Sequence, residues 1–188
     1  NLPVMLGPFT GYRLPWVAGL KKRVTNSIGH VYPIAGGLTS CPGTCRYAYD
    51  FADGTMFPLV AAKGGTVKAW KTSCANNDPD CTNYLILEDQ STVPVSYQLY
   101  WHMMNESVPA NLRVVGTQVL RGQFIGNVDN TGPSTGSHLH FHVYTTATGA
   151  NWSWGPSVDF IFEDVADNDG HPRTCAEASA RPDLGSQC

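Results

Sequence analysis

The stretch TGSHLHFHVY, residues 135–144, places three of the six histidines of the chain at alternate positions. Side chains at i, i+2 and i+4 of a β-strand share one face, which would group His138, His140 and His142. The opposite face would carry the apolar residues Leu139, Phe141 and Val143. This alternation predicts a half-buried strand whose imidazole face serves a metal or catalytic site. The alternative is a surface ladder of polar residues.

The chain has 188 residues, a length that predicts a single domain over residues 1–188 with a core of its own. Its formal net charge of −3 and its 14% of charged residues provide no polycationic surface for nucleic acid. The sequence contains no long apolar run, so we expect no membrane span. The opening NLPVMLGPF lacks a basic n-region and an initiator Met, which favours a mature or trimmed product.

The six cysteines fall into three pairs of near neighbours: Cys41/Cys45, Cys74/Cys81 and Cys175/Cys188. Six cysteines allow fifteen pairings, of which pairing between near neighbours is the simplest. An even count in a chain rich in turn residues favours disulfides in an oxidising compartment, so we expect a secreted, extracellular or periplasmic protein. A zinc knuckle is the alternative, although the spacings of three, six and twelve intervening residues match no C-x-x-C pattern.

Short alternating segments separated by glycine and proline predict a mainly β fold, with one central antiparallel sheet, long surrounding loops and local disulfides. Strands are expected within residues 57–70, 83–89, 95–103, 119–128 and 137–144. Short helical turns are expected within 108–114 and 157–164. The sheet is expected within residues 45–144, with residues 1–44 and 145–188 wrapping around it.

Two further residues, Asp50 and His102, are candidates for a metal or catalytic site. Asp50 stands between Tyr49 and Phe51, where a carboxylate is costly to bury unless it is paired or bound to a metal. His102 lies in the aromatic-rich segment YQLYWHM. Zinc at catalytic sites takes three protein ligands from His, Asp or Glu together with a water. The alternatives are a turn-capping Asp50 and a packed histidine at a strand end.

Four blocks of the sequence occur in an order that resembles a known family. They are RYAYDFADGTMFPLVAAKGGTV (46–67), YQLYWHM (97–103), GTQVLRGQFIGNVDNTG (116–132) and STGSHLHFHV (134–143). Their order and wording resemble the lysostaphin/LytM-type zinc endopeptidases, including the β-lytic metallopeptidases. The resemblance covers roughly residues 45–144, and the H-x-H motif alone would be a weak signal.

This resemblance implies roles for individual residues. Asp50 and His140 would be zinc ligands. His102 and His138 would be the catalytic histidines, which orient and deprotonate the attacking water or stabilise the oxyanion. His142 occupies a position where the family often has Glu, and we expect it at the rim of the sheet rather than on the metal.

One position departs from the family pattern. Many members carry a ligand in an H-x-x-x-D spacing, and the corresponding residue here is Arg46, whose guanidinium stays protonated and cannot bind zinc. Some members, including the β-lytic type, place this histidine further upstream. His30 in SIGHVYP is therefore the candidate third ligand, and without it the site would be inactive. His171 is expected to be incidental.

The resemblance implies a monomeric, secreted zinc metalloendopeptidase. It would hydrolyse peptide bonds of bacterial cell-wall peptidoglycan, in glycine-containing cross-bridges or stem peptides, by means of a zinc-activated water. One alternative is an inactive module of the same fold that binds cell-wall peptide or a partner protein. Another is a carbohydrate-binding β-domain with incidental histidines. Trp152 and Trp154 either line a substrate groove or serve only for packing.

Overall fold

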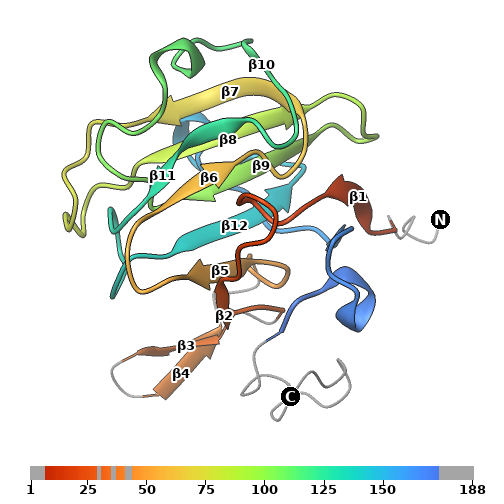
Figure 1. Cartoon of the computed structure of the whole chain (residues 1–188), viewed down its shortest axis with the longest axis horizontal. Coiled ribbons are helices and arrows are strands. Elements are labelled where there is room, and N and C mark those ends of the chain that lie inside the picture. The colour runs from red at the N-terminus through yellow and green to blue at the C-terminus, as the bar shows by residue number, and fades with distance from the viewer. Residues whose placement is uncertain (1–6, 29–30, 35–36, 41–43, 174–188) are drawn as a thin grey trace.

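The computed structural model describes residues 7–28, 31–34, 37–40 and 44–173, with the backbone alone for 31–34 and 37–40. A seven-stranded sheet in the order β10-β7-β8-β9-β12-β5-β2 forms its centre, and all neighbouring strands are antiparallel (Figure 1). The strands are β2 (Arg23–Asn26), β5 (Tyr49–Ala52), β7 (Gly65–Lys71), β8 (Tyr84–Asp89), β9 (Ser96–Trp101), β10 (Gln118–Val119) and β12 (Leu139–Tyr144). The predicted mainly β fold with a central antiparallel sheet is confirmed.

Smaller elements surround this sheet. Three two-stranded pairs are β6 (Phe57–Val60) with β11 (Phe124–Val128), β3 (Val31–Ile34) with β4 (Gly37–Ser40), and the parallel pair β1 (Phe9–Tyr12) with β13 (Phe160–Phe162). Short 3-10 helices span Ala110–Leu112, Ala150–Trp152 and Asp167–Gly170. Figure 1 shows β6 and β11 lying across one face of the main sheet.

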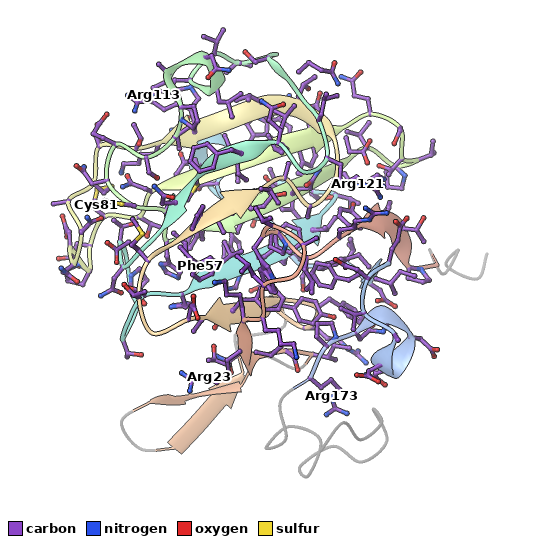
Figure 2. The ribbon with its side chains drawn as sticks, in the orientation of Figure 1. Arg23, Phe57, Cys81, Arg113, Arg121 and Arg173 are labelled. Carbon is purple, nitrogen blue, oxygen red and sulfur yellow. A yellow bond between two sulfur atoms is a disulfide. The ribbon has the colours of Figure 1, made fainter. Side chains whose placement is uncertain are left out.

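The face of the main sheet beneath β6 and β11 packs the larger apolar core. Phe57 of β6 and Ile125 of β11 are buried there (Figure 2 labels Phe57). The apolar residues of β12 join the same cluster, as the alternation predicted: Leu139, Phe141 and Val143. The opposite face carries a smaller cluster of Ala69, Tyr84, Ile86, Tyr97, Leu99 and Tyr144. The sheet therefore separates two packing environments.

Strand β12 is more deeply buried than the sequence predicts. All six of its residues are buried, because β9 and β5 pair with it on both sides and both of its faces are covered. The expectation of a half-buried strand is wrong on the histidine face, where the ring of Trp154 packs against His140 and His142. A polar face can be buried in this way only if its side chains find hydrogen-bond partners.

The expectations for the flanking segments are partly wrong. Residues 157–164 contain strand β13 rather than a helical turn, because Phe160 and Phe162 enter the apolar core while the backbone pairs with β1. The N-terminal segment does more than wrap the sheet, since β2 is an edge strand paired with β5. The helical turn expected within 108–114 is present as the 3-10 helix Ala110–Leu112.

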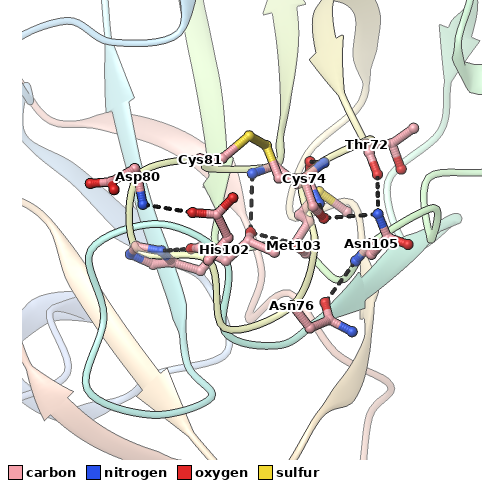
Figure 3. Close-up of a disulfide and its surroundings, with 11 residues drawn as sticks. Thr72, Cys74, Asn76, Asp80, Cys81, His102, Met103 and Asn105 are labelled. Atoms are coloured by element: carbon pink, nitrogen blue, oxygen red, sulfur yellow. Dashed lines mark hydrogen bonds between the residues drawn. A yellow bond between two sulfur atoms is a disulfide. The ribbon is translucent and has the colours of Figure 1, made fainter.

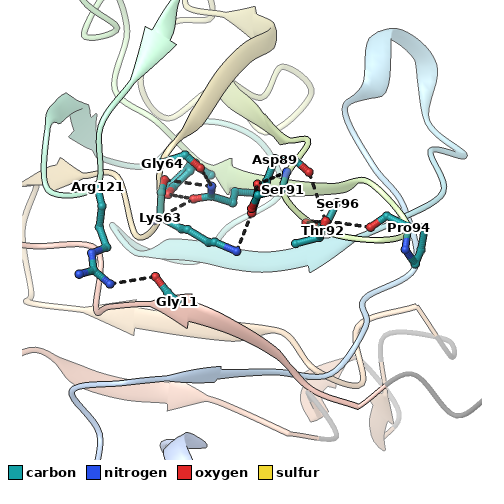
Figure 4. Close-up of polar contacts among 11 residues, drawn as sticks. Gly11, Lys63, Gly64, Asp89, Ser91, Thr92, Pro94, Ser96 and Arg121 are labelled. Carbon is teal, nitrogen blue, oxygen red and sulfur yellow. Dashed lines mark hydrogen bonds and ion pairs between the residues drawn. The ribbon is translucent and has the colours of Figure 1, made fainter.

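Polar contacts fasten the turn between β6 and β7 to strands β8 and β9. The Lys63 ammonium lies 2.6 Å from an Asp89 carboxylate oxygen, and the Lys63 backbone N–H donates to the Gln98 side chain at 3.2 Å (Figure 4). Arg121 donates to the carbonyl of Gly11 at 3.2 Å. The Arg121 contact ties β1 to the β10–β11 turn, and the Lys63 contacts tie the β6–β7 turn to the main sheet.

The structure tests one of the three predicted disulfides in full. Cys74 and Cys81 form a disulfide, as predicted, and Cys45 is also disulfide-bonded. No cysteine among the described residues is free. Cys41, Cys175 and Cys188 lie outside the described residues. Within the described part of the chain, no helix is long and apolar enough to cross a membrane.

Candidate active site

The site is built on a row of residues that face one another across four strands. Asn26 of β2 is opposite Asp50 of β5, Asp50 is opposite His140 of β12, and His140 is opposite Trp101 of β9. Directly opposite residues in antiparallel strands have Cβ atoms about 4.5–5.5 Å apart. Strand register alone therefore gathers an amide, a carboxylate and an imidazole on the histidine face.

Asp50 and His140 are close enough to share a metal ion. The Oδ1 atom of Asp50 lies 3.1 Å from Nδ1 of His140, and the two residues are only 6% and 5% exposed. Two ligands of a tetrahedral zinc ion, each bound at about 2.0–2.2 Å, lie about 3.3 Å apart. Asn26 donates from Nδ2 to the other Asp50 oxygen at 2.9 Å, which leaves Oδ1 directed at His140. The distance and the donor types both fit zinc.

The third ligand expected from the sequence, His30, lies outside the described residues. Among the residues that are described, no group of three or more His, Cys, Asp or Glu side chains is arranged to hold a metal. Arg46, which stands at the family's H-x-x-x-D histidine position, is exposed and lies over the ring of Tyr47, 5.5 Å from its centroid. The described part of the chain thus provides two ligands for the proposed metal.

His138 lies beside this pair and faces the cleft. Its Nε2 atom is 3.7 Å from Oδ1 of Asp50. Its Nδ1 atom is 2.9 Å from the carbonyl oxygen of Gly136 and 3.0 Å from Oγ of Ser134. A carbonyl oxygen can only accept, so Nδ1 carries the hydrogen and the neutral ring keeps its lone pair on Nε2. That lone pair points toward the Asp50 side of the site.

His102 approaches from the end of β9. It has the left-handed φ of 67°, a conformation that histidine tolerates better than most residues and that turns the chain at the end of the strand. Its ring centroid lies 4.5 Å from that of His138. Its Nδ1 donates to the carbonyl of Thr131 at 2.6 Å, which leaves a lone pair on Nε2. Burial first, and then the charge of His138, lower the pKa of His102 to about 3, so the ring is neutral at pH 7.

The disulfide loop supports His102 indirectly (Figure 3). The side chain of Asn83 bonds both the N–H and the carbonyl of Cys74, at 2.8 and 2.9 Å. The Asn83 N–H donates to Oγ1 of Thr131 at 3.0 Å, and that hydroxyl donates to the carbonyl of Met103 at 2.8 Å. Thr131 is the residue whose carbonyl holds His102. The Cys74–Cys81 loop therefore helps to fix a side chain of the site.

The sequence suggested that His142 lies at the rim of the sheet, and the structure does not place it there. It is fully buried beneath His140, with its Nδ1 2.9 Å from Nε2 of His140 and its Nε2 2.9 Å from the carbonyl oxygen of Gly155. Trp154 covers both rings, with centroids 5.4 Å from that of His140 and 4.8 Å from that of His142. Trp154 thus packs on the histidines, and Trp152, 38% exposed, lies against Tyr97.

A cleft of about 310 Å³ opens beside Asp50 and His138. Its lining comes from β2, β5, the turn that follows β5 and the loop before β12: Arg23, Thr25, Asn26, Asp50, Ala52, Gly54, Thr135, Gly136, Ser137 and His138. Arg23 extends from the edge strand (Figure 2). His138 lines this cleft and His102 is not among its lining residues, so His138 is the more accessible of the two catalytic candidates. His171 belongs to a different group, in which its Nε2 lies 2.7 Å from Asp159.

The sequence predicted that Asp50, His102, His138 and His140 belong to one site, but it did not predict their hydrogen-bond partners. Asn26, which orients Asp50, carries no motif of its own, and only the pairing of β2 with β5 places it there. The carbonyls that hold the histidines belong to Thr131, Gly136 and Gly155, and a backbone acceptor leaves no trace in residue type.

The sequence also matches a known protein family. Residues 45–152, more than half of the chain, match Peptidase family M23. The chain belongs to peptidase family M23. The lysostaphin/LytM-type resemblance of the sequence is thereby confirmed.

Three solved structures illustrate the likeness. A zinc-containing peptidase from Vibrio cholerae is 26% identical, with a TM-score of 0.48, and the match covers 70% of this chain and 36% of that one. The catalytic domain of the prophage-encoded M23 protein EnpA from Enterococcus faecalis, solved as a point mutant, is 21% identical, with a TM-score of 0.50 and coverage of 79% and 94%. The complex of SpoIIIAH and SpoIIQ is 17% identical, with a TM-score of 0.52, and the match covers 72% of this chain and 92% of that one. The chain thus spans about a third of the Vibrio cholerae peptidase.

Proposed function

We propose that this M23 family member is a secreted zinc metalloendopeptidase that hydrolyses peptide bonds in bacterial cell-wall peptidoglycan. The observation that carries the proposal is the buried pair of Asp50 Oδ1 and His140 Nδ1, 3.1 Å apart, at the side of an open cleft. A carboxylate and an imidazole at this separation match the ligand types and spacing of a catalytic zinc site.

Zinc would be held by Asp50, His140 and, as we propose from the sequence, His30. When bound, zinc supplies Lewis acidity that polarises a peptide carbonyl and acidifies water. Asn26 keeps the Asp50 carboxylate in a single orientation by occupying its second oxygen. Outer partners of this kind orient metal ligands and raise affinity.

His138 is the residue we assign to proton transfer. Its Nε2 lone pair faces Asp50 at the cleft, and Gly136 holds its Nδ1–H so that the ring cannot turn away. A neutral imidazole in this position can accept a proton from water and pass it to the leaving amine. His102 has the same tautomer, so its Nε2 accepts hydrogen bonds and does not donate them, which suits orientation of the nucleophile better than stabilisation of an oxyanion.

The cleft suits an extended peptide with small side chains. Its lining combines the hydroxyls of Thr25, Thr135 and Ser137 and the amide of Asn26 with two glycines, Gly54 and Gly136. Such a surface offers hydrogen bonds to a peptide backbone, and it carries no large apolar side chain against which a bulky substrate residue could pack. This favours glycine-containing cross-bridges or stem peptides as substrates. The disulfide chemistry of Cys45, Cys74 and Cys81 favours a secreted protein.

The test is hydrolysis of purified peptidoglycan and of a pentaglycine peptide, followed by mass spectrometry of the products. We expect cleavage that stops when a chelator is added and returns when zinc is restored. The variant His138→Ala should retain zinc and lose turnover, whereas His171→Ala, a matched imidazole outside the cleft, should keep both. A fully zinc-loaded chain that cleaves neither substrate would reject the enzymatic proposal.

The alternative is a binding module of the same fold for cell-wall peptide or a partner protein. Arg46 at the family's ligand position favours it, as does the solved complex of SpoIIIAH and SpoIIQ, a structural neighbour seen with a protein partner. This alternative predicts saturable binding of intact peptidoglycan or of a partner protein without product release. A carbohydrate-binding β-domain with incidental histidines is disfavoured. Burying the Asp50 carboxylate beside His140 is costly, and such a domain has no use for the pair.

A further inference from the structure

Beneath the proposed metal ligand, His142 connects a side chain to the backbone. It is fully buried and touches His140 through one ring nitrogen and Gly155 through the other, each at 2.9 Å. Both contacts have hydrogen-bond length, and each needs one donor and one acceptor. The chemistry of the three groups therefore decides where the hydrogens lie.

The carbonyl oxygen of Gly155 decides the tautomer of His142. A carbonyl oxygen only accepts, so Nε2 of His142 carries the hydrogen. A neutral His142 then has its lone pair on Nδ1, which must receive a hydrogen bond. The neighbouring nitrogen is Nε2 of His140, so that nitrogen carries the second hydrogen.

The tautomer of His142 also fixes which nitrogen of His140, the proposed metal ligand, carries a lone pair. With its hydrogen on Nε2, a neutral His140 presents the Nδ1 lone pair to Oδ1 of Asp50 at 3.1 Å. Two acceptors that face each other at this distance do not form a hydrogen bond, and they are arranged to receive a cation. Two charged states compete with this arrangement. An imidazolium at His140 would donate to both Asp50 and His142, and an imidazolium at His142 would donate to both His140 and Gly155 and leave the His140 hydrogen on Nδ1.

We propose that His142 is a positioning residue that fixes the tautomer of His140 and so presents its Nδ1 to the metal; this rests on the proposed zinc site. The chain of contacts runs from a backbone carbonyl through two imidazoles to the ligand atom. Histidine suits the position because each ring nitrogen can take a different role. A glutamate could accept from His140 but has no hydrogen for Gly155 when ionised.

The anchor of this chain is a fixed piece of backbone. A Cβ atom on Gly155 would lie 2.4 Å from both the carbonyl of Thr146 and the ring of Tyr144, so only glycine fits. The Nε1–H of Trp101 donates to the carbonyl of Ser153 at 2.9 Å, and the backbone of Thr148 donates to the carbonyl of Trp154 at 2.9 Å. These contacts hold the Gly155 carbonyl against His142.

Two variants separate positioning from packing. In His142→Gln, the amide oxygen can accept from His140 while the amide nitrogen donates to Gly155, so both bonds can be rebuilt. In His142→Phe, a ring of similar size fills the space and makes neither bond. Nitrogen-15 NMR of the histidines, recorded on metal-free protein at pH 8, reads the tautomer of His140 directly. Competition with a chromophoric chelator measures the affinity for zinc.

We expect the wild type and His142→Gln to show a hydrogen on Nε2 of His140 and none on Nδ1. His142→Phe should lose this preference and bind zinc about 10- to 100-fold more weakly. An unchanged tautomer and affinity in His142→Phe would overturn the inference, as would a wild-type His140 protonated on Nδ1. If His142→Phe does not fold, His142→Glu replaces it: an acceptor at that site should preserve the His140 tautomer, and a hydrogen on Nδ1 instead would overturn the inference.

Failure of this inference and failure of the proposed function are distinguishable. The tautomer is measured without metal or substrate, so it reports on His142 even if the wild type neither binds zinc nor cleaves peptidoglycan. Conversely, a wild-type chain that binds zinc and cleaves its substrate, with His142→Phe matching it in affinity and tautomer, would reject the role of His142 alone.

Discussion

The two faces of strand β12 are both buried, but one packs by apolar contacts and the other is held by hydrogen bonds. On one face, Leu139, Phe141 and Val143 pack into the main apolar core. On the other face, His140 and His142 are also buried, and their ring nitrogens contact each other and the carbonyl of Gly155. Apolar packing tolerates many shapes, whereas a buried polar face requires a partner for each atom. Substitutions on the first face should cost stability, and substitutions around the second should cost zinc binding or turnover.

The largest expected effect is on turnover. His138→Ala removes the imidazole that faces the cleft, and general acid–base groups of this kind contribute about 10²- to 10⁴-fold. We expect peptidoglycan hydrolysis to fall by that factor while zinc content and the unfolding midpoint in urea stay near those of the wild type. Loss of zinc in this variant would move His138 from the catalytic residues to the ligands.

On the apolar face, Phe141→Ala tests stability. The Phe141 ring contacts those of Tyr100 and Phe160, with centroids 5.0 and 5.5 Å away, and the residue is fully buried. Truncation should lower the free energy of unfolding by about 3–5 kcal/mol, as measured by urea denaturation. The control is Phe124→Ala, at a site 46% exposed, which should cost far less. Equal costs for the two would contradict the division between faces.

A smaller effect is expected where the two ligands are oriented. Asn26→Ala removes the donor to the second oxygen of Asp50, and loss of such an outer partner weakens metal binding about 10- to 100-fold. Chelator competition measures this change. Thr25→Ala is the matched control, because the Thr25 hydroxyl bonds the backbone carbonyl of Asp50 rather than its carboxylate, and it should change zinc affinity far less. Equal losses would mean that β2 acts through packing alone.

The smallest effect concerns an imidazole outside the site. His171 donates to Asp159 at 2.7 Å and to the carbonyl of Asn168 at 3.0 Å, and these contacts, the one to Asp159 first, raise its pKa. The raised pKa stabilises the fold fully below about pH 6.5, the ordinary value, and this contribution is lost as pH rises through the raised pKa. The stability gap between the wild type and His171→Gln should therefore be about 1 kcal/mol or less at pH 5 and narrower at pH 9. A gap that widens with pH would contradict the charged pairing.

The fold was largely predictable because strand patterns are local. The alternation in residues 137–144 and the strand-turn-strand pattern in 57–70 are both present as strands. Strand β13 was missed because its pairing with β1 joins segments some 150 residues apart, and nothing within residues 157–164 records that contact.

The site was predictable only at the level of residue type. Asp50, His102, His138 and His140 stand out as polar residues in apolar segments or in a motif. The predicted position of His142 was wrong because a polar residue can be buried only where it finds a hydrogen-bond partner. Here that partner is the backbone carbonyl of Gly155, which residue type does not reveal. The role of His30 remains a prediction from the resemblance.

The proposed zinc site is tested most directly by diffraction from a crystal of the zinc-loaded chain, measured on both sides of the zinc absorption edge. A zinc ion held by Asp50 and His140 should give an anomalous peak within bonding distance of Oδ1 of Asp50 and Nδ1 of His140. A peak elsewhere, or none at these two atoms when zinc is in excess, would contradict it.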